Sequence, residues 1–260
     1  MKRKVTPQIL KEIILLKKKG TKISEISTKF NLSDRTINKY SKKIPHPNKK
    51  SIISNPASAK KLTKHKSELL GFLCSEGNDN DYTDNYMSYD PRRNKSYLRK
   101  TKREWINFSN TDLSLQNRFI FLMNKVYDYP LKVYKKGTIY LKRKEVVKDL
   151  RKYTLFGSKK WKVPNELFDK KYENQAKYFI RSFVDGDGTI DLVKKSVIID
   201  STNKNSLKEM SNLLKKLKIN NKYYDFKNGY RIVIKDVRTY KKLIGCFHCN
   251  KKEKLNIICK

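Results

Sequence analysis

The sequence predicts an α+β protein in which a small all-α unit precedes two halves of one plan, each with the element order αββαββα. Two apolar nonapeptides, each ending in an acid and a glycine, predict the two halves, and matched spacings later in each half support them. Apolar residues at helical spacing predict the all-α unit. The predicted boundaries are 1–43 for the helical unit, 44–66 for a linker, and 67–163 and 164–260 for the two halves.

Charge is the strongest feature of the composition. Lys and Arg number 62 against 25 Asp and Glu, so the formal net charge is +37 and a polyanion is the first partner to consider. This excess excludes most acidic or neutral metabolic enzymes, and a hydrophobic content of 37% excludes a wholly disordered basic tail. The apolar run 13–16 is too short to span a membrane, so no membrane partner is expected. Four cysteines fit reduced thiols in the cytoplasm, near the nucleoid, or in an organelle.

The first 43 residues predict three short helices. Gly20 ends the first, and Ser33 caps the third after a tight turn at 31–33. The residues expected to face the core are Ile9, Ile13, Leu16, Ile23, Ile26, Phe30, Ile37 and Tyr40. This is the pattern of a helix-turn-helix domain, whose outward residues would reach DNA: Asp34, Arg35, Thr36, Asn38 and Lys39. The alternative is a packing module with a solvated basic face.

Residues 44–66 predict a basic linker. They are rich in proline and lysine and have no apolar period. Such a segment extends by self-repulsion, and a polyanion would draw it in.

The two halves repeat one another in order and spacing. Residues 69–77 and 180–188 share apolar positions, a small third residue, and an acid before glycine. A helical stretch and a glycine-centred hairpin follow in each half, and 23 positions separate Gly137 from Lys160 and Gly229 from Lys252. The first hairpin after the acid is longer than the second. Duplication predicts two units related by a pseudo-twofold axis, which suits a pseudosymmetric duplex.

The repeated acids, Glu76 and Asp187, predict a metal site. Each lies at the end of an apolar helix before a glycine that is expected to adopt the left-handed conformation. A carboxylate there faces the negative end of the helix dipole, so two matched cases suggest a divalent cation. Gly71 and Ser182 would let the helices pack closely and bring the acids together. The alternative is that both are ordinary residues beside helix-end turns.

The two nonapeptides, 69–77 and 180–188, resemble the duplicated motif of the LAGLIDADG homing endonucleases in their single-chain form, with a close match at 183–188. The resemblance covers roughly residues 64–260. The sequence departs from the motif at Cys74, Ser75 and Ser182. The resemblance implies two αββαββα subdomains whose sheets form a saddle over double-stranded DNA. It also implies a monomer that cleaves both strands, with Mg²⁺, or Mn²⁺ in its place, held by Glu76 and Asp187.

The resemblance implies further roles as well. Lys160 and Lys252 match the basic residue near the active site of the family, and four polar strand ends would order water: Ser109, Asn110, Thr202 and Asn203. Strand side chains would contact DNA: Arg92, Arg93, Arg99, Arg103, Arg231 and Lys235. Trp105 and Trp161 are expected in the core or sheets rather than as stacking platforms.

Two other functions stay open. One is a DNA-binding regulator in which a helix-turn-helix precedes a LAGLIDADG-like domain without nuclease acids, and the retained Glu76 and Asp187 argue against it. The other is an RNA splicing maturase, which the sequence does not exclude. Intron homing by a site-specific endonuclease is the function that the sequence favours.

Overall fold

The structure is a computed structural model that describes residues 5–18, 21–41, 61–90 and 94–260. By its internal contacts the chain divides into two compact units, Met1–Ser54 and Asn55–Lys260. Within the described ranges, no helix has the length and apolar character needed to cross a membrane.

The described residues of the N-terminal unit form three helices around one small core. They are α1 (Pro7–Lys18), α2 (Ile23–Phe30) and α3 (Asp34–Ser41). Ile13, Ile26 and Ile37 are fully buried against one another, as the helical spacing predicts. Asn31 ends α2 in the left-handed conformation with φ 51°, and the Ser33 hydroxyl accepts a hydrogen bond from the Thr36 amide at 3.2 Å, which confirms the predicted cap. Gly20 lies outside the described residues.

The prediction that Tyr40 packs inward is wrong, because its side chain is 42% exposed. One buried position, Ile37, suffices for the eight-residue α3, since residues of α1, α2 and the turn fill the rest of the core. The Lys39 ammonium lies over the Tyr40 ring at 5.8 Å instead.

The first described helix of the second unit includes the end of the predicted linker. Residues 44–60 of that linker lie outside the described ranges. The helix starts at Lys64, and the Thr63 hydroxyl caps it by accepting from the Lys66 amide at 3.2 Å. Lys66 is buried and donates to Asp149 at 2.6 Å. Lys66, which the lysine-rich composition places in the predicted linker, is therefore part of the core.

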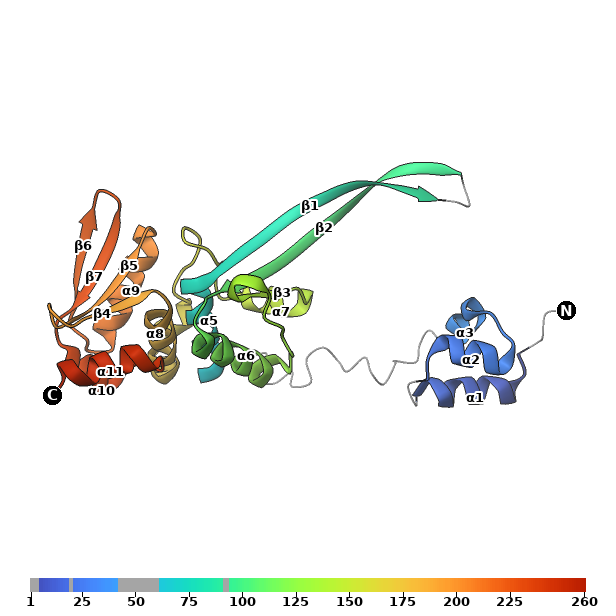
Figure 1. The fold of residues 1–260 in the computed structure, drawn as a ribbon, viewed down its shortest axis with the longest axis horizontal. Coiled ribbons are helices and arrows are strands. Elements are labelled where there is room, and N and C mark those ends of the chain that lie inside the picture. The colour runs from blue at the N-terminus through green and yellow to red at the C-terminus, as the bar shows by residue number, and fades with distance from the viewer. Residues whose placement is uncertain (1–4, 19–20, 42–60, 91–93) are drawn as a thin grey trace. The chain divides into compact units, whose positions relative to one another are not determined.

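The two halves of the second unit begin with the same element order, a helix, two strands, a helix and a strand (Figure 1). The first half comprises α5 (Lys64–Glu76), β1 (Gly77–Asp90), β2 (Lys95–Ser109), α6 (Leu113–Tyr127), β3 (Thr138–Leu141) and α7 (Lys144–Leu150). The second comprises α8 (Glu173–Asp187), β4 (Gly188–Asp191), β5 (Ser196–Ser201), α9 (Lys204–Lys216), β6 (Lys222–Phe226), β7 (Gly229–Ile234), α10 (Val237–Leu243) and α11 (Cys249–Ile258). Short 3₁₀ turns lie at Lys135–Gly137, Asn165–Phe168 and Lys170–Tyr172. The mixed fold with two antiparallel sheets agrees with the predicted α+β class.

The sheets differ in size within the described residues. The second has four strands in the order β4-β5-β7-β6, whereas the first has three, β1-β2-β3. A fourth strand was expected in the first half, but only an isolated bridge from Val133 to Ile139 is present there. Pro130 lacks an N–H donor, which disfavours a full strand at this position. Strands β1 and β2 instead form the long predicted hairpin, which extends beyond the helices (Figure 1).

Each sheet buries one face against helices and leaves the other open. In the second sheet Val197, Ile199 and Ile232 point into the core, while Asp200 and Arg231 lie on the open face. In the first sheet Ile106 and Phe108 are buried, and Phe108 stacks on Phe119 with ring centroids 4.2 Å apart. The alternation of strand side chains therefore produces two open polar faces on one unit.

Helices α5 and α8 pack against each other where they carry their smallest residues. A Cβ atom added to Gly71 would overlap the Ser182 Oγ and the Phe179 carbonyl, and one added to Gly186 would overlap the Ser75 Oγ and lie 3.1 Å from the Glu76 Cγ. These close approaches confirm the predicted packing of the helices through Gly71 and Ser182. They bring the ends of the two helices together.

We expect Gly71→Ala to lower the free energy of unfolding by about 1–3 kcal/mol, because the added methyl group forces two close-packed helices apart. Urea denaturation followed by circular dichroism measures this change. Ser182→Ala is the matched control and should have a small effect alone. The double variant should remain destabilised, because the Phe179 carbonyl is still in the way; wild-type stability of Gly71→Ala would contradict the packing described here.

Candidate active site

Glu76 and Asp187 are the last residues of α5 and α8, so the helix pair places both carboxylates in one region. Burial and the negative charge of Glu76 raise the pKa of Asp187 to about 7, and the Lys251 ammonium offsets part of that rise. The two acids therefore lie close enough to disfavour joint ionisation.

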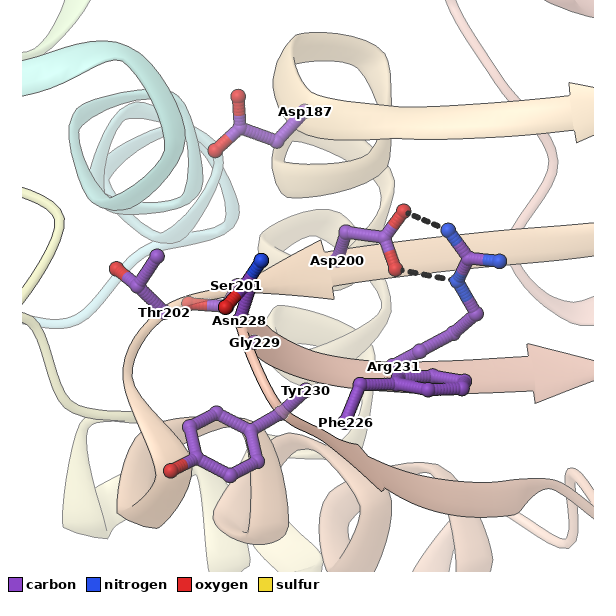
Figure 2. Close-up of a pocket in the computed structure, with 9 residues that line it drawn as sticks. All are labelled: Asp187, Asp200, Ser201, Thr202, Phe226, Asn228, Gly229, Tyr230 and Arg231. Carbon is purple, nitrogen blue, oxygen red and sulfur yellow. Dashed lines mark hydrogen bonds and ion pairs between the residues drawn. The ribbon is translucent and has the colours of Figure 1, made fainter.

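The two acids have different surroundings. The Asn110 side-chain amide donates to the Glu76 Oε1 at 2.8 Å. Burial raises the pKa of Glu76, while this hydrogen bond and Lys251 oppose the rise. Asp187 instead lines an open pocket of about 520 Å³ on the open face of the second sheet (Figure 2). One carboxylate is held by a neighbour, and the other faces a space that a ligand can enter.

Neither glycine after the acids adopts the expected left-handed conformation. Gly77 has φ −91° and ψ 152°, and Gly188 has φ −75° and ψ 158°, both extended. Each begins a strand directly, and a Cβ on either would overlap the backbone of the preceding helix, at Leu73 and Val184 respectively. Close approach of the chain to itself, rather than a positive φ, explains why glycine is needed here.

The positive charge of Lys251 lowers the pKa of both acids, and sequence reasoning missed this residue. Its ammonium donates to the carbonyl oxygens of Val184 (2.7 Å), Asp185 (2.7 Å) and Gly186 (3.1 Å). These carbonyls lie in the last turn of α8, where a positive charge is favourable, and the Val184 carbonyl also accepts from the Gly188 amide. Burial lowers the pKa of Lys251, and the surrounding carboxylates oppose that change.

The segment before α11 explains why Lys251 reaches the site. The buried Asp185 carboxylate accepts hydrogen bonds from the Phe247 amide at 3.0 Å and the His248 amide at 3.3 Å. These bonds fix the first turn of α11 beside the end of α8. Leu255 is buried one helical turn after Lys251 and therefore on the same face. The i, i+4 spacing of Lys251 and Leu255 is therefore the sequence pattern that could have identified Lys251 as an inward-facing lysine.

The two predicted lysines lie elsewhere on the surface. Lys252 is exposed on α11, one position beyond the lysine that faces the acids, and Lys160 is exposed in the segment before α8. The number of positions from the hairpin glycine to the lysine locates the helix but does not show which of its residues face the acids. Successive helical residues point about 100° apart, so an error of one residue changes the side of the helix.

The four predicted polar strand ends have separate roles. Asn110 contacts Glu76, and Thr202 lines the pocket together with Asp187. Ser109 lies on the open face of the first sheet and donates to the Thr138 hydroxyl at 3.3 Å. Asn203 caps α9 by accepting from the Ser206 amide and also donates to the Trp161 carbonyl at 2.9 Å, so its polar groups serve the fold.

The predicted DNA-contacting residues are mostly exposed. On α3, Arg35, Asn38 and Lys39 face solvent, while the Thr36 hydroxyl bonds to Ser33.

On the sheets, Arg99 lies over the Tyr86 ring at 5.9 Å, and Arg103 pairs with Asp84 at 2.7 Å. Arg231 pairs with Asp200, and Lys235 donates to the Lys194 carbonyl at 2.9 Å. Arg92 and Arg93 lie outside the described residues.

An aromatic pocket of about 570 Å³ lies on the open face of the first sheet. The Tyr82 and Trp105 rings meet there edge to face at 5.3 Å, with Tyr140, Lys142 and Lys144 also in its wall. Trp161 is buried as expected, whereas Trp105 is partly open in this pocket. The alternation of strand residues could have indicated this, because Ile106 points to the core.

The donor set at the acids fits a hard divalent cation. Two carboxylates with raised pKa values are costly to ionise side by side, and a cation between them removes that cost. No cluster of three or more His, Cys, Asp or Glu side chains with metal-binding geometry occurs in the described part of the chain. Mg²⁺ needs no such cluster, because it commonly binds through one or two carboxylates together with substrate phosphate oxygens and water.

Comparison with known proteins finds a family match in the second half of the chain. Residues 174–248, which run from α8 to the segment before α11, match the family described as LAGLIDADG-like domain. The matched residues include Asp187, the pocket and the second sheet.

Three similar proteins illustrate the range of relatives. Over 179 residues (62% of the chain) the sequence is 26% identical to a DNA polymerase of Methanocaldococcus jannaschii, of which it spans 9% of the length. I-DmoI in complex with DNA and Mn has a TM-score of 0.48 at 16% identity, covering 71% of this chain and 97% of that one. Full-length DUF199/WhiA from Thermatoga maritima has a TM-score of 0.47 at 19% identity, covering 78% and 64%.

We expect the stability of the metal-free protein to fall as pH rises from about 4 to 7. An unfolded Asp titrates near about 3.9, whereas Asp187 titrates at about 7 in the fold, so the folded state binds the extra proton between these values. Asp187→Asn should remove this slope and be more stable than wild type at pH 8. Urea denaturation in EDTA at pH 5 and pH 8 measures both effects.

The matched control is Glu253→Gln on the exposed surface of α11, which should keep the wild-type slope. A slope that persists in Asp187→Asn would show that other groups cause it.

Proposed function

We propose that this protein is a site-specific endonuclease that hydrolyses both strands of double-stranded DNA with a divalent metal ion, as in intron homing. The observation that carries the proposal is the pairing of Glu76 and Asp187 at the ends of two packed helices, next to an open pocket. The net charge of +37 supports a nucleic-acid substrate.

Catalysis explains the paired acids better than binding alone. A protein that only bound DNA would be more stable with amide or apolar residues in place of two partly buried, mutually repelling carboxylates. It would also bind a polyanion more tightly without their negative charge. The lower stability and the weaker binding of a polyanion are both offset if the acids hold a cation that acts on the phosphate.

Glu76 and Asp187 would hold Mg²⁺, with Mn²⁺ able to substitute. When bound, the metal polarises the scissile phosphate and lowers the pKa of the attacking water. Asn110 orients Glu76 and helps to keep it ionised. We assign to Lys251, in place of Lys252, the positive charge beside the reacting groups.

The open faces of the two sheets would hold the duplex. The long β1–β2 hairpin carries Arg99 and Arg103, and the second sheet carries Arg231 and Lys235. The exposed residues of α3 would make the N-terminal unit an additional DNA contact, as in a helix-turn-helix domain. Because one chain contains both acids, we propose that it acts as a monomer, in the cytoplasm near the nucleoid or in an organelle.

We expect Glu76→Gln or Asp187→Asn to reduce cleavage at least about a thousandfold, because each removes a carboxylate that holds the metal. The assay is plasmid cleavage in Mg²⁺ or Mn²⁺ at a target selected from randomised duplexes, with EDTA as the metal control and Glu253→Gln as the matched variant. Binding should persist in both variants. Cleavage by the double variant would refute the role of the acids, and wild-type binding without cleavage would indicate a DNA-binding regulator instead.

We expect Lys251→Met to slow cleavage about 10- to 100-fold and to move the acid limb of the pH–rate profile upward. Lys251 lowers the pKa of both acids, so its loss raises the pH at which they ionise. Lys252→Met is the matched control, one residue away and exposed, and should cleave like wild type. Equal effects of the two substitutions would contradict the assignment.

A further inference from the structure

Asp200 and Arg231 form a two-bond pair on the open face of the second sheet. The Arg231 Nε donates to the Asp200 Oδ1 at 2.6 Å, and its Nη2 donates to the Oδ2 at 2.9 Å. The two residues lie directly opposite each other on the antiparallel strands β5 and β7. Both side chains are substantially exposed, at 51% and 38%. An exposed pair of opposite charges on neighbouring strands stabilises a sheet only slightly, so stability alone gives little reason for a carboxylate on a surface proposed to bind a polyanion.

Arg231 is fixed on a second side by an aromatic ring. Its guanidinium carbon lies 5.6 Å from the centroid of the Phe226 ring, which comes from the neighbouring strand β6 (Figure 2). Asp200 occupies one edge of the guanidinium, which leaves the remaining N–H groups unused by this carboxylate. The pair therefore holds a planar fork of donors in one orientation on an open surface.

This fork lies in the same pocket as Asp187 (Figure 2). A base that contacts Arg231 would therefore lie close to the phosphate that reaches the acids. Two parallel N–H donors match the O6 and N7 acceptors of guanine in the major groove. Adenine presents an amino group at the position of O6, which would repel the second donor.

We infer that Arg231, oriented by Asp200, recognises a guanine next to the cleavage centre on the side of the second subdomain. Asp200 acts as a positioning residue and touches no base. The inference rests on the proposed binding of duplex DNA, although not on cleavage. It also explains why a surface that binds a polyanion carries a carboxylate, because Asp200 restricts the orientation of the arginine that faces the base.

The first sheet offers a contrast. Arg103 forms an ion pair with Asp84, with its Nη2 at 2.7 Å from the Oδ2, and is 55% exposed on the long hairpin. Such an ion pair fixes the plane of the guanidinium less than two parallel hydrogen bonds do. Arg103 suits a phosphate contact, and Asp84 provides a matched control for the removal of an exposed carboxylate.

The test is selection by binding from a randomised duplex library, followed by affinity measurements on the selected site. We expect wild type to require guanine at one position flanking the centre, and Asp200→Ala and Arg231→Ala to lower that preference about tenfold or more. Asp200→Ala should bind non-specific duplex as well as wild type or better, since it removes a negative charge. Asp84→Ala should keep the preference.

Replacing that guanine with 7-deazaguanine removes the N7 acceptor alone. This change should weaken binding by wild type and have little effect on Arg231→Ala. An unchanged selection profile in Asp200→Ala, or a full 7-deazaguanine effect in Arg231→Ala, would overturn the inference while leaving the endonuclease proposal intact. Binding with guanine preference but without cleavage would support the inference and refute the nuclease. Absence of duplex binding would refute both.

Discussion

The close approach of α5 and α8 is the constraint on which the site depends. Glycine and serine at the contact leave no room between the helices, so the residues that end them must share one partly buried region. The next residue in each half begins a strand, which fixes the open faces of both sheets beside that region. A change at Gly71 would therefore alter the relation of the two acids as well as the stability of the protein.

Duplication of the motif has not produced two equal environments. Glu76 is held by the Asn110 amide, whereas Asp187 faces an open pocket and has a pKa of about 7. The ammonium of Lys251 caps the last carbonyl groups of α8, whereas in α5 the Ser75 hydroxyl donates to the Gly71 and Phe72 carbonyls, one turn before the end of the helix. Near neutral pH without a cation, Asp187 is therefore only partly ionised, which relieves part of the repulsion between the acids.

Sequence patterns identified the features that depend on residue identity and period. The two apolar nonapeptides located the helix ends that carry Glu76 and Asp187, and the glycine-centred hairpins located part of each sheet. The patterns did not show which side of a helix or strand a residue occupies. Lys251 rather than Lys252 faces the acids, and Trp105 lines an open pocket. The sequence identified the glycines after the acids but gave the wrong reason for them. Their close contact with the preceding helix is seen only in the folded structure.

The contacts that join the two halves also position the charge at the site. Phe247 lies between the guanidinium groups of Arg118 from α6 and Arg181 from α8, at 4.6 Å and 4.3 Å from its ring centroid. The neighbouring His248 ring contacts Asp112, the cap of α6, at 2.7 Å. Because α11 starts directly after these residues and carries Lys251, the ammonium that faces the acids is anchored to both halves at once. Movement of one half relative to the other would displace this charge from the carboxylates, so the interface and the candidate active site act as one structural element.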